Sequence, residues 1–184
     1  METITGKPTE DSTLYLDIDG VIFPLSGRKE GVEHGANDIV WVEKHEFYRP
    51  SIVKRLGELS TRIVLSSSRG VATLVDPAYK NLLDELNVAG VLSVHAWEPA
   101  NPDHKLDAII RHQNGTHNAF KRRKFDASPI GSKLIWVDDD ANKINIDTPL
   151  DRLSSKSFLT VVPDAYSGLT HQHVDTIESF IKGN

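Results

Sequence analysis

The chain has 184 residues, of which 39% are hydrophobic and 26% are charged, and this length and composition suit one globular domain with its own core. The net charge of −5 excludes a whole-protein attraction to nucleic acid, so such binding would need a local basic patch. Because cysteine is absent, disulfides, thiol nucleophiles and thiolate metal sites are excluded. The sequence contains neither an apolar run near the roughly 18 residues of a membrane span nor the apolar core of a signal peptide, so we expect a cytoplasmic protein without a membrane partner.

The N-terminal part of the chain predicts a tail, a strand and an insert. Residues 1–12 are polar and indicate a flexible tail, and residues 13–184 indicate a single domain. A buried strand is expected over about Thr13–Ile18, where apolar residues surround two aspartates and a glycine follows at once. Residues 24–49 are polar and rich in glycine around one strand-like run, Ile39–Val42, which indicates a short hairpin flap.

The next segment predicts two helices and two strands. A helix should begin at Pro50, because a proline in the first turn loses no intrahelical hydrogen bond. The apolar run from Arg62 predicts a second strand, and it ends in the serines Ser66–Ser68. Asp76 followed by proline predicts the start of a second helix, and Gly90–Val94 is a third, short strand.

A third helix and a polar insert follow. Lys105 stands at the start of this helix, whose inner face should be Leu106, Ile109 and Ile110. The insert covers about residues 113–132 and contains the basic run Lys121–Lys124. Such a run is usually a solvated surface, and nucleic-acid contact is the alternative.

The C-terminal part completes the pattern of strands that alternate with helices. Leu134–Val137 and Phe158–Val162 are the fourth and fifth strands, and a last helix should run from a Thr170 cap to a stop at Gly183, with Val174, Ile177 and Ile181 as its buried stripe. This alternation favours an α/β fold with a Rossmann-like, mainly parallel sheet and helices on both faces.

Polar side chains follow the first, second and fourth predicted strands. Asp17 and Asp19 end the first strand, serines end the second, and Asp138 and Asp139 follow the fourth. The carboxyl ends of parallel strands meet at one edge of a sheet, where ligands bind in open α/β folds. We therefore expect these groups to converge there. Their carboxylates would repel one another unless a cation lies between them or one of them keeps its proton.

These residues resemble a known family. Asp-x-Asp-Gly after a first strand, Ser after a second, Lys opening a later helix and Asp-Asp after a further strand resemble the four ordered motifs of the haloacid dehalogenase (HAD) superfamily, over about Leu14–Val162. The serine run also resembles the Ser-x-Arg motif in the phosphatase half of phage polynucleotide kinase/phosphatases. This motif selects Ser67 with Arg69, and Ser66 is the alternative if the strand ends one residue earlier. The resemblance implies a HAD-like fold with a small flap instead of a full cap domain.

The resemblance implies a Mg²⁺ site and a covalent nucleophile. Asp17 and Asp138 would bind Mg²⁺ through their side chains, Asp19 through its backbone carbonyl and Asp139 through water. A carboxylate with a reference pKa near 3.9 is ionised at neutral pH, so Asp17 should attack phosphorus without a base. At about 4 Å and an effective dielectric near 20, each phosphate charge repels that carboxylate by about 4 kcal/mol, which a hard divalent cation would cancel.

The remaining roles concern substrate binding and proton transfer. Lys105 would bind a phosphoryl oxygen and steady the nucleophile, Ser67 would donate to another oxygen, and Arg69 would bind substrate or pair with a carboxylate. Asp19 would protonate the leaving alkoxide and later activate water, which requires a raised pKa that the neighbouring acids would provide.

The leading hypothesis is a Mg²⁺-dependent phosphohydrolase that cleaves phosphate monoesters through an aspartyl-phosphate. A short flap leaves the site open, so polynucleotide 3′-ends or nucleotides are candidate substrates, and a small phosphorylated metabolite is the alternative. Two other classes of protein are alternatives to a phosphohydrolase. One is a signalling receiver domain, in which the acidic pair comes early and the phosphoacceptor follows a middle strand. The other is a catalytically silent binding domain.

Overall fold

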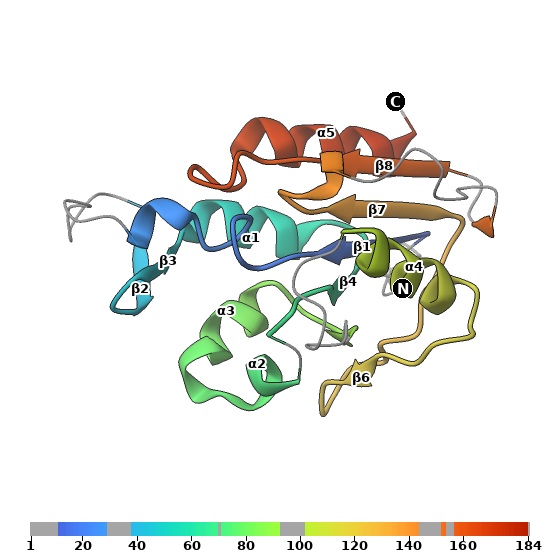
Figure 1. Ribbon diagram of the computed structural model, residues 1–184, viewed down its shortest axis with the longest axis horizontal. Coiled ribbons are helices and arrows are strands. Elements are labelled where there is room, and N and C mark those ends of the chain that lie inside the picture. Colours follow the sequence, from blue (N-terminus) through green and yellow to red (C-terminus); the bar gives the residue numbers. More distant parts are fainter. Residues whose placement is uncertain are drawn as a thin grey trace, which may run out of the picture.

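The computed structural model describes residues 11–28, 38–69, 71–92, 102–143, 152–153 and 157–183. Within them, six strands form one sheet in the order β6-β5-β4-β1-β7-β8 (Figure 1). Their bounds are β1 (Ser12–Leu16), β4 (Arg62–Leu65), β5 (Gly90–Val91), β6 (Phe120–Lys121), β7 (Lys133–Val137) and β8 (Ser157–Val161). All neighbouring strands are parallel except β5 and β6, which are antiparallel.

The order of the parallel strands defines where a ligand can bind. Numbered along the chain, β1, β4, β5, β7 and β8 lie in the order 3-2-1-4-5, which is the Rossmann-type order. The order reverses between β1 and β7, so the carboxyl ends of these two strands form the topological switch point. The predicted α/β fold with a mainly parallel sheet is confirmed.

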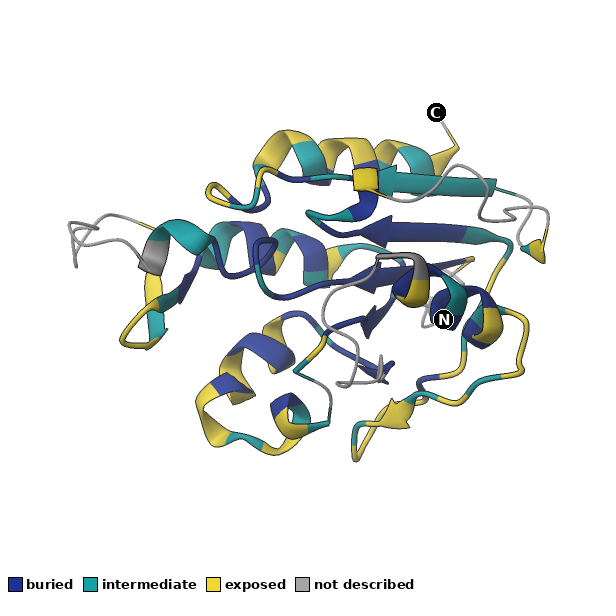
Figure 2. Ribbon diagram, viewed as in Figure 1, coloured by how far each residue is buried: buried dark blue, intermediate teal, exposed yellow. Residues whose placement is uncertain are grey.

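Helices cover both faces of the sheet. The face that carries Leu14 and Leu16 packs against α1 (Pro50–Glu58), α3 (Lys80–Glu85) and α5 (His171–Lys182). The opposite face carries Tyr15 and packs against α4 (Pro102–Gln113). Because successive side chains of a strand point to opposite faces, β1 contributes to both cores, and the central strands are buried along their length (Figure 2).

The last helix begins and ends as its sequence predicts. The Thr170 hydroxyl accepts a hydrogen bond from the His173 backbone N–H, and Gly183 ends the helix with a φ of +79°. Val174 and Ile177 are buried as expected, whereas Ile181 is only partly buried.

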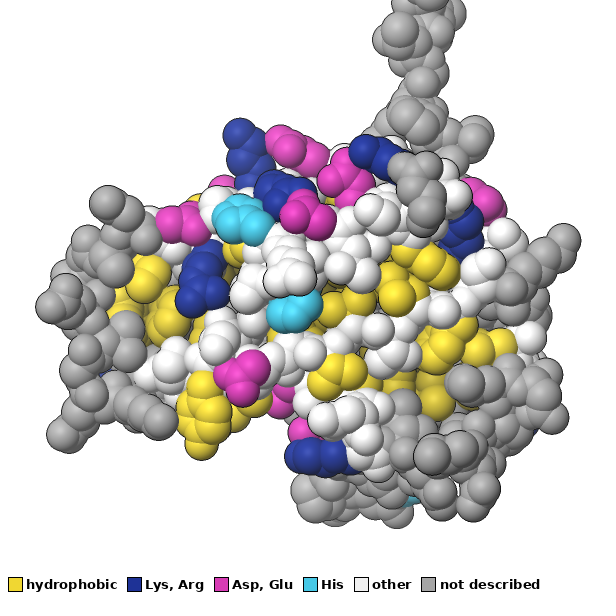
Figure 3. Space-filling view, turned by 90° about the horizontal axis from the view of Figure 1, so that it is seen from above, with side chains coloured by type: hydrophobic (Ala, Val, Ile, Leu, Met, Phe, Trp, Pro, Cys, Tyr) yellow, Lys and Arg dark blue, Asp and Glu magenta, His cyan; other side chains and the backbone are white. Residues whose placement is uncertain are grey.

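The outer surface of α5 is charged. Figure 3 shows this side of the molecule, where basic and acidic side chains lie close together. The Arg55 guanidinium on α1 lies 2.6 Å from the Asp175 carboxylate on α5, so an exposed ion pair links the two helices. None of the helices within the described part of the chain is long and apolar enough to cross a bilayer.

Several element boundaries differ from the predictions. The first strand includes Ser12, whose buried hydroxyl donates to Thr61, so the predicted tail ends earlier than expected; residues 1–10 lie outside the described part of the chain. The third strand is only Gly90–Val91, and residues 93–94 also lie outside the described part.

The predicted helix after Asp76 begins as a 3₁₀ turn, η2 (Pro77–Tyr79), before α3, and a separate single turn, α2 (Ala72–Val75), precedes it. Asp76 caps the turn through a hydrogen bond from the Ala78 N–H. Lys105 lies within the first turn of α4 rather than at its start, because the helix already begins at Pro102.

The predicted hairpin is present. The strands β2 (Val40–Glu43) and β3 (Glu46–Tyr48) pair antiparallel and form a separate two-stranded sheet. Phe47 and Tyr48 are buried, and the ring centroids of Trp41 and Phe47 lie 5.2 Å apart. Short 3₁₀ turns at η1 (Leu25–Arg28) and η3 (Ala141–Lys143) complete the described elements.

Candidate functional site

The carboxyl ends of β4, β1 and β7 lie side by side, and the backbone keeps their register beyond the last strand residues. The Asp17 N–H donates to the Val137 carbonyl at 2.9 Å, and the Ser66 N–H donates to the Leu16 carbonyl at 2.8 Å. The Asp138 N–H in turn donates to the Val161 carbonyl at 3.2 Å. Backbone hydrogen bonds of the kind found within the sheet therefore fix the position of the first polar residue after each of these strands.

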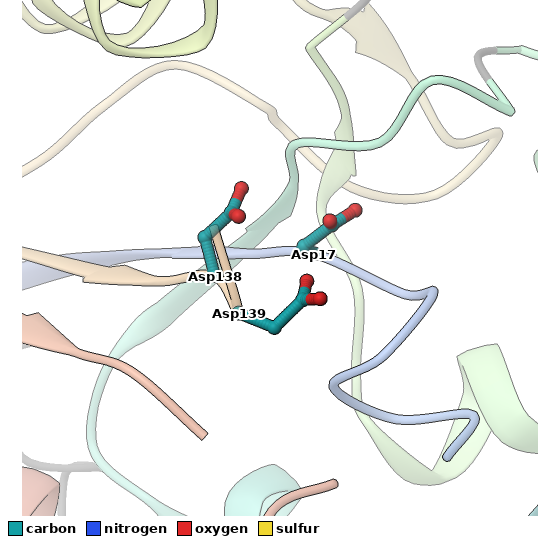
Figure 4. A group of neighbouring side chains, drawn as sticks. All are labelled: Asp17, Asp138 and Asp139. Carbon is teal, nitrogen blue, oxygen red and sulfur yellow. The ribbon is translucent and has the colours of Figure 1, made fainter. Parts of the chain in front are cut away.

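Three carboxylates meet at this edge. One oxygen from each of Asp17, Asp138 and Asp139 lies within 4.8 Å of the other two, and Figure 4 shows the three side chains gathered around one small space. Asp17 is 5% exposed and Asp138 is fully buried. A cluster of carboxylate oxygens is the donor set that hard divalent cations such as Mg²⁺ prefer.

Lys105 provides the cationic partner of this cluster. Its Nζ donates to Asp17 Oδ2 at 2.6 Å and to Asp138 Oδ2 at 2.8 Å, and the residue is only 7% exposed. Burial lowers the pKa of Lys105, but the two carboxylates outweigh it and raise that pKa above its ordinary value. Lys105 is therefore held as an ammonium ion against two of the three acids.

One ammonium group does not balance the three carboxylates. Burial is the main cause that raises the pKa of Asp17 to about 7, and Asp138 adds to it while Lys105 opposes it. Burial and the neighbouring Asp138 and Asp140 raise the pKa of Asp139 to about 6. Asp17 is therefore less readily ionised than its reference pKa suggested, and the cluster has the electrostatic character of a site for a further cation.

The turn after β1 packs against this cluster. Gly20 has a φ of +73°, and a Cβ added to it would lie 2.5 Å from Asp139 Oδ2. The glycine thus satisfies two requirements at once, the left-handed backbone and the close approach of Asp139.

The side chain of Asp19 lies outside the carboxylate cluster. Arg69 donates to it twice, from Nε to Oδ2 at 3.0 Å and from Nη2 to Oδ1 at 2.5 Å. The alternative in which Arg69 pairs with a carboxylate is therefore observed. The described hydrogen bonds of its guanidinium go to Asp19, Glu46 and Tyr79, and none of these residues belongs to the cluster.

Two residues that the sequence did not single out complete this arrangement. Glu46 on β3 accepts hydrogen bonds from Arg69 Nη1 at 3.0 Å and Nη2 at 2.5 Å, and the Tyr79 hydroxyl donates to Glu46 at 2.8 Å. Burial raises the pKa of Glu46, but the hydrogen bonds from Arg69 and Tyr79 outweigh it and the pKa is lowered. A lone acid in a hairpin and a tyrosine after a proline form no motif, so spacing could not have identified them.

The strand-end serines are both buried. Ser67 Oγ accepts a hydrogen bond from the Arg69 N–H at 3.2 Å, which closes a local turn. Ser66 Oγ is buried without a hydrogen-bond partner among the described residues. Either hydroxyl keeps the capacity to donate to a ligand oxygen.

Only part of the predicted basic run Lys121–Lys124 is engaged in ion pairs with acidic residues of the protein. Arg122 forms an ion pair with Asp84 and donates to the Leu83 carbonyl at 2.6 Å, so it has a structural role. Lys121 lies 3.5 Å from Asp126. In the described part of the chain, Arg123 and Lys124 are exposed and form no ion pair. The aromatic side chains that flank the run, Phe120 and Phe125, are 53% and 37% exposed.

A separate cavity of about 470 Å³ lies at the C-terminal end of α4, lined by residues that include His112, His117 and Ser128. The Nδ1 of His112 lies 2.8 Å from the buried hydroxyl of Tyr15, and burial lowers the pKa of His112 to about 4. None of the predicted site residues lines this cavity, so it is distinct from the carboxylate cluster.

Comparisons of this chain with protein-family models, curated proteins and solved structures give no match in any of the three. Its function is therefore inferred from its own residues. The cluster offers oxygen ligands for a hard cation and a buried carboxylate beside a lysine. A further aspartate, Asp19, lies two residues from Asp17 but outside the cluster.

Proposed function

We propose that the protein is a HAD-type, Mg²⁺-dependent phosphatase that cleaves phosphate monoesters through an aspartyl-phosphate on Asp17. The proposal rests on one observation. Asp17, Asp138 and Asp139 converge with Lys105 at the switch point of a Rossmann-type sheet, where α/β folds bind their ligands.

The covalent chemistry needs a nucleophile and an acid–base group. A carboxylate oxygen of Asp17 attacks phosphorus in line, and the bond between phosphorus and the ester oxygen breaks. Asp19 gives its proton to the leaving alkoxide. It then takes a proton from the water that attacks the aspartyl-phosphate, which releases inorganic phosphate and restores Asp17.

The residues at the site fit Mg²⁺. Asp17 and Asp138 would bind it through their side chains, Asp19 through its carbonyl and Asp139 through water, and when bound it would neutralise the charge of the phosphoryl oxygens. The raised pKa values of Asp17 and Asp139 support this assignment, because they indicate a shortage of positive charge in the cluster.

The predicted substrate-binding residues differ in their surroundings. Lys105 lies within the cluster, so it is placed to hold a phosphoryl oxygen against the nucleophile. Ser67, or alternatively Ser66, would donate to another oxygen. Since carboxylates already engage Arg69, its contribution to substrate binding is the less supported of the three.

The strand order bears on the receiver alternative. The order here is 3-2-1-4-5, whereas receiver domains have the flavodoxin-like order 2-1-3-4-5. This difference favours a phosphatase over a receiver. The motif order supports the same choice, because Asp17-x-Asp19 comes first and Asp138-Asp139 last, whereas a receiver has its phosphoacceptor aspartate after a middle strand. The convergence of Asp17, Asp138, Asp139 and Lys105 favours it over a silent binding domain.

Two features support a polynucleotide end or a nucleotide as substrate. The hairpin β2–β3 would serve as the small flap, and it is too short to enclose the substrate as a cap domain does. The second feature is a row of paired residues that crosses four neighbouring strands, β1, β4, β5 and β6, and consists of Leu16, Leu65, Val91 and Phe120. Leu16 immediately precedes Asp17. Three strand spacings of about 4.8 Å therefore separate the exposed Phe120 from Leu16 by about 14 Å. A base could stack there, with Arg123 and Lys124 close by in sequence.

The test is phosphate release with and without Mg²⁺ from 3′-phosphorylated and 5′-phosphorylated oligonucleotides, mononucleotides and sugar phosphates. We expect Mg²⁺-dependent release, and a loss of at least about 10³-fold in Asp17→Asn, since the nucleophile is removed. Asp140→Asn makes the same change outside the cluster and should keep its activity. Release that survives in Asp17→Asn would rule out the covalent mechanism, and release from sugar phosphates alone would favour the metabolite alternative.

A further inference from the structure

We propose that Glu46 is a positioning residue of this site, which acts through Arg69 to hold the carboxylate of Asp19 where it can protonate the leaving group. This inference rests on the proposed phosphatase function. It assigns a catalytic purpose to the hairpin β2–β3, which carries Glu46.

The first link joins Arg69 to Asp19. Two N–H groups of the guanidinium bind the two carboxylate oxygens of Asp19 at 3.0 and 2.5 Å. Such a bidentate pair fixes both the position and the plane of the carboxylate.

The second link joins Arg69 to the hairpin. Glu46 accepts from Nη1 and Nη2 at 3.0 and 2.5 Å, and Nη1 also donates to the Tyr79 hydroxyl at 2.6 Å. A guanidinium carries five N–H groups. The five hydrogen bonds to Asp19, Glu46 and Tyr79 use this full capacity, so the group cannot rotate without breaking at least one of them.

The hydrogen bonds to Asp19, Glu46 and Tyr79 are the main restraint on the orientation of the Arg69 guanidinium. Its guanidinium carbon lies 5.4 Å from the ring centroid of Phe23 and 5.7 Å from that of Tyr79, which limits its movement out of the plane. Within the plane, only hydrogen bonds set its orientation. The Arg69 side chain is 20% exposed and that of Glu46 is 16% exposed, so water only partly replaces a lost partner.

The removal of Glu46 would therefore act on Asp19 at a distance. In Glu46→Gln the amide oxygen can accept from only one of the two guanidinium N–H groups, and the amide NH₂ cannot accept from the other. Arg69 could then turn on its flexible stem and carry the Asp19 carboxylate with it. The cluster of Asp17, Asp138 and Asp139 would stay as it is, because none of its described contacts involves Glu46. Nucleophilic attack should persist while protonation of the leaving group fails.

The leaving group of the substrate separates these two steps. An alkyl phosphate releases a strongly basic alkoxide and needs the proton, whereas 4-nitrophenyl phosphate releases a stabilised phenolate and does not. We expect Glu46→Gln to lower kcat on an alkyl phosphate by about 10- to 100-fold, a part of the 10²–10⁴-fold that general acid catalysis contributes. Its kcat on 4-nitrophenyl phosphate should stay within about 3-fold, and KM should change little on both.

Glu43→Gln is the matched control, because Glu43 pairs with Glu46 across the hairpin but is exposed and has no described bond to Arg69. It should behave as the wild type on both esters. Tyr79→Phe keeps the ring and removes only the hydroxyl, so it should reproduce the selective loss to a smaller degree if Glu46→Gln is poorly folded.

The outcomes distinguish the inference from the function on which it rests. Equal losses on the two esters in both variants, or no loss in either, would overturn the positioning role of Glu46. An inactive wild type on both esters would overturn the proposed phosphatase function, and the positioning role with it.

Discussion

Asp17 and Asp138 follow adjacent parallel strands and share one counter-charge, because Lys105 Nζ lies 2.6 Å from the first carboxylate and 2.8 Å from the second. All three side chains are nearly or fully buried. A shared ammonium group holds the two acids together but leaves Asp139 without an equivalent partner in the cluster. This imbalance leaves the cluster short of positive charge.

The first prediction concerns Lys105. Lys105→Met should lower the free energy of unfolding by about 3–5 kcal/mol, because it leaves two buried carboxylates without their partner. Turnover should fall as well. Denaturation in urea measures the first effect and phosphate release the second. Lys143→Met removes the exposed partner of Asp140 and serves as the control. An unchanged unfolding midpoint in Lys105→Met would show that the ion pairs do not stabilise the fold.

The second prediction concerns pH in metal-free buffer. The pKa of Asp17 is raised from 3.8 to about 7, so the folded protein binds this proton more tightly than the unfolded chain does. The resulting stability is fully present below about pH 4 and is lost as the pH rises through about 7, by up to about 1.4 kcal/mol per pH unit for one proton.

Thermal unfolding between pH 4 and pH 8 would reveal this slope. Asp17→Asn should make it shallower, since the asparagine does not titrate, while Asp139, whose pKa is raised to about 6, still contributes. Mg²⁺ at pH 8 should raise Tm in the wild type, because an ion that binds only the folded state stabilises it by mass action. A wild-type Tm at pH 8 that is insensitive to Mg²⁺ would argue against the metal site.

The third prediction compares two glycines with nearly the same backbone. Gly20 and Gly115 have φ values of +73° and +72°, but a Cβ at Gly115 would meet nothing within 4 Å. Gly115→Ala should cost only the backbone strain, about 1–2 kcal/mol. Gly20→Ala should cost more and should raise the Mg²⁺ concentration for half-maximal activity, because it displaces Asp139. Equal effects of the two variants on that concentration would contradict the role of Gly20.

The fourth prediction concerns the exposed basic residues. The double variant Arg123→Gln, Lys124→Gln should weaken the use of phosphorylated oligonucleotides but not of 4-nitrophenyl phosphate. If both side chains bind phosphates of a single strand, the slope of log affinity against log salt should become shallower by about 1.4. Lys54→Gln removes an exposed charge from α1 and serves as the control. An unchanged slope would make Arg123 and Lys124 ordinary surface residues.

The fold and the carboxylate cluster were largely predictable from the sequence. Alternating apolar runs and helical stripes define a mainly parallel sheet, and the carboxyl ends of parallel strands must share an edge. Once Asp17 and Asp138 follow two such strands, their proximity depends only on whether these strands are neighbours. The prediction that Lys105 belongs to the same site needed the resemblance to a family, because a lysine near a helix start is usually solvated.

The contacts outside the strand ends could not be predicted. Glu46 reaches Arg69 because the hairpin folds back towards the sheet edge, and no local pattern encodes that direction. The antiparallel strand β6 is two residues long and its side chains are exposed, so it has no periodicity to detect. The sequence predicted that Asp76 caps a helix, but it did not predict that this helix begins as a 3₁₀ turn, because capping residues are shared by α-helices and 3₁₀-helices.

The place of β7 in the chain affects how the protein is made. Asp138 and Asp139 follow β7, and only β8 and α5 come after them among the larger described elements. A ribosome must therefore add a further 121 residues (138 − 17) after Asp17 before Asp138 can join it. A nascent chain therefore lacks the three-carboxylate cluster until β7 has been synthesised and has paired with β1.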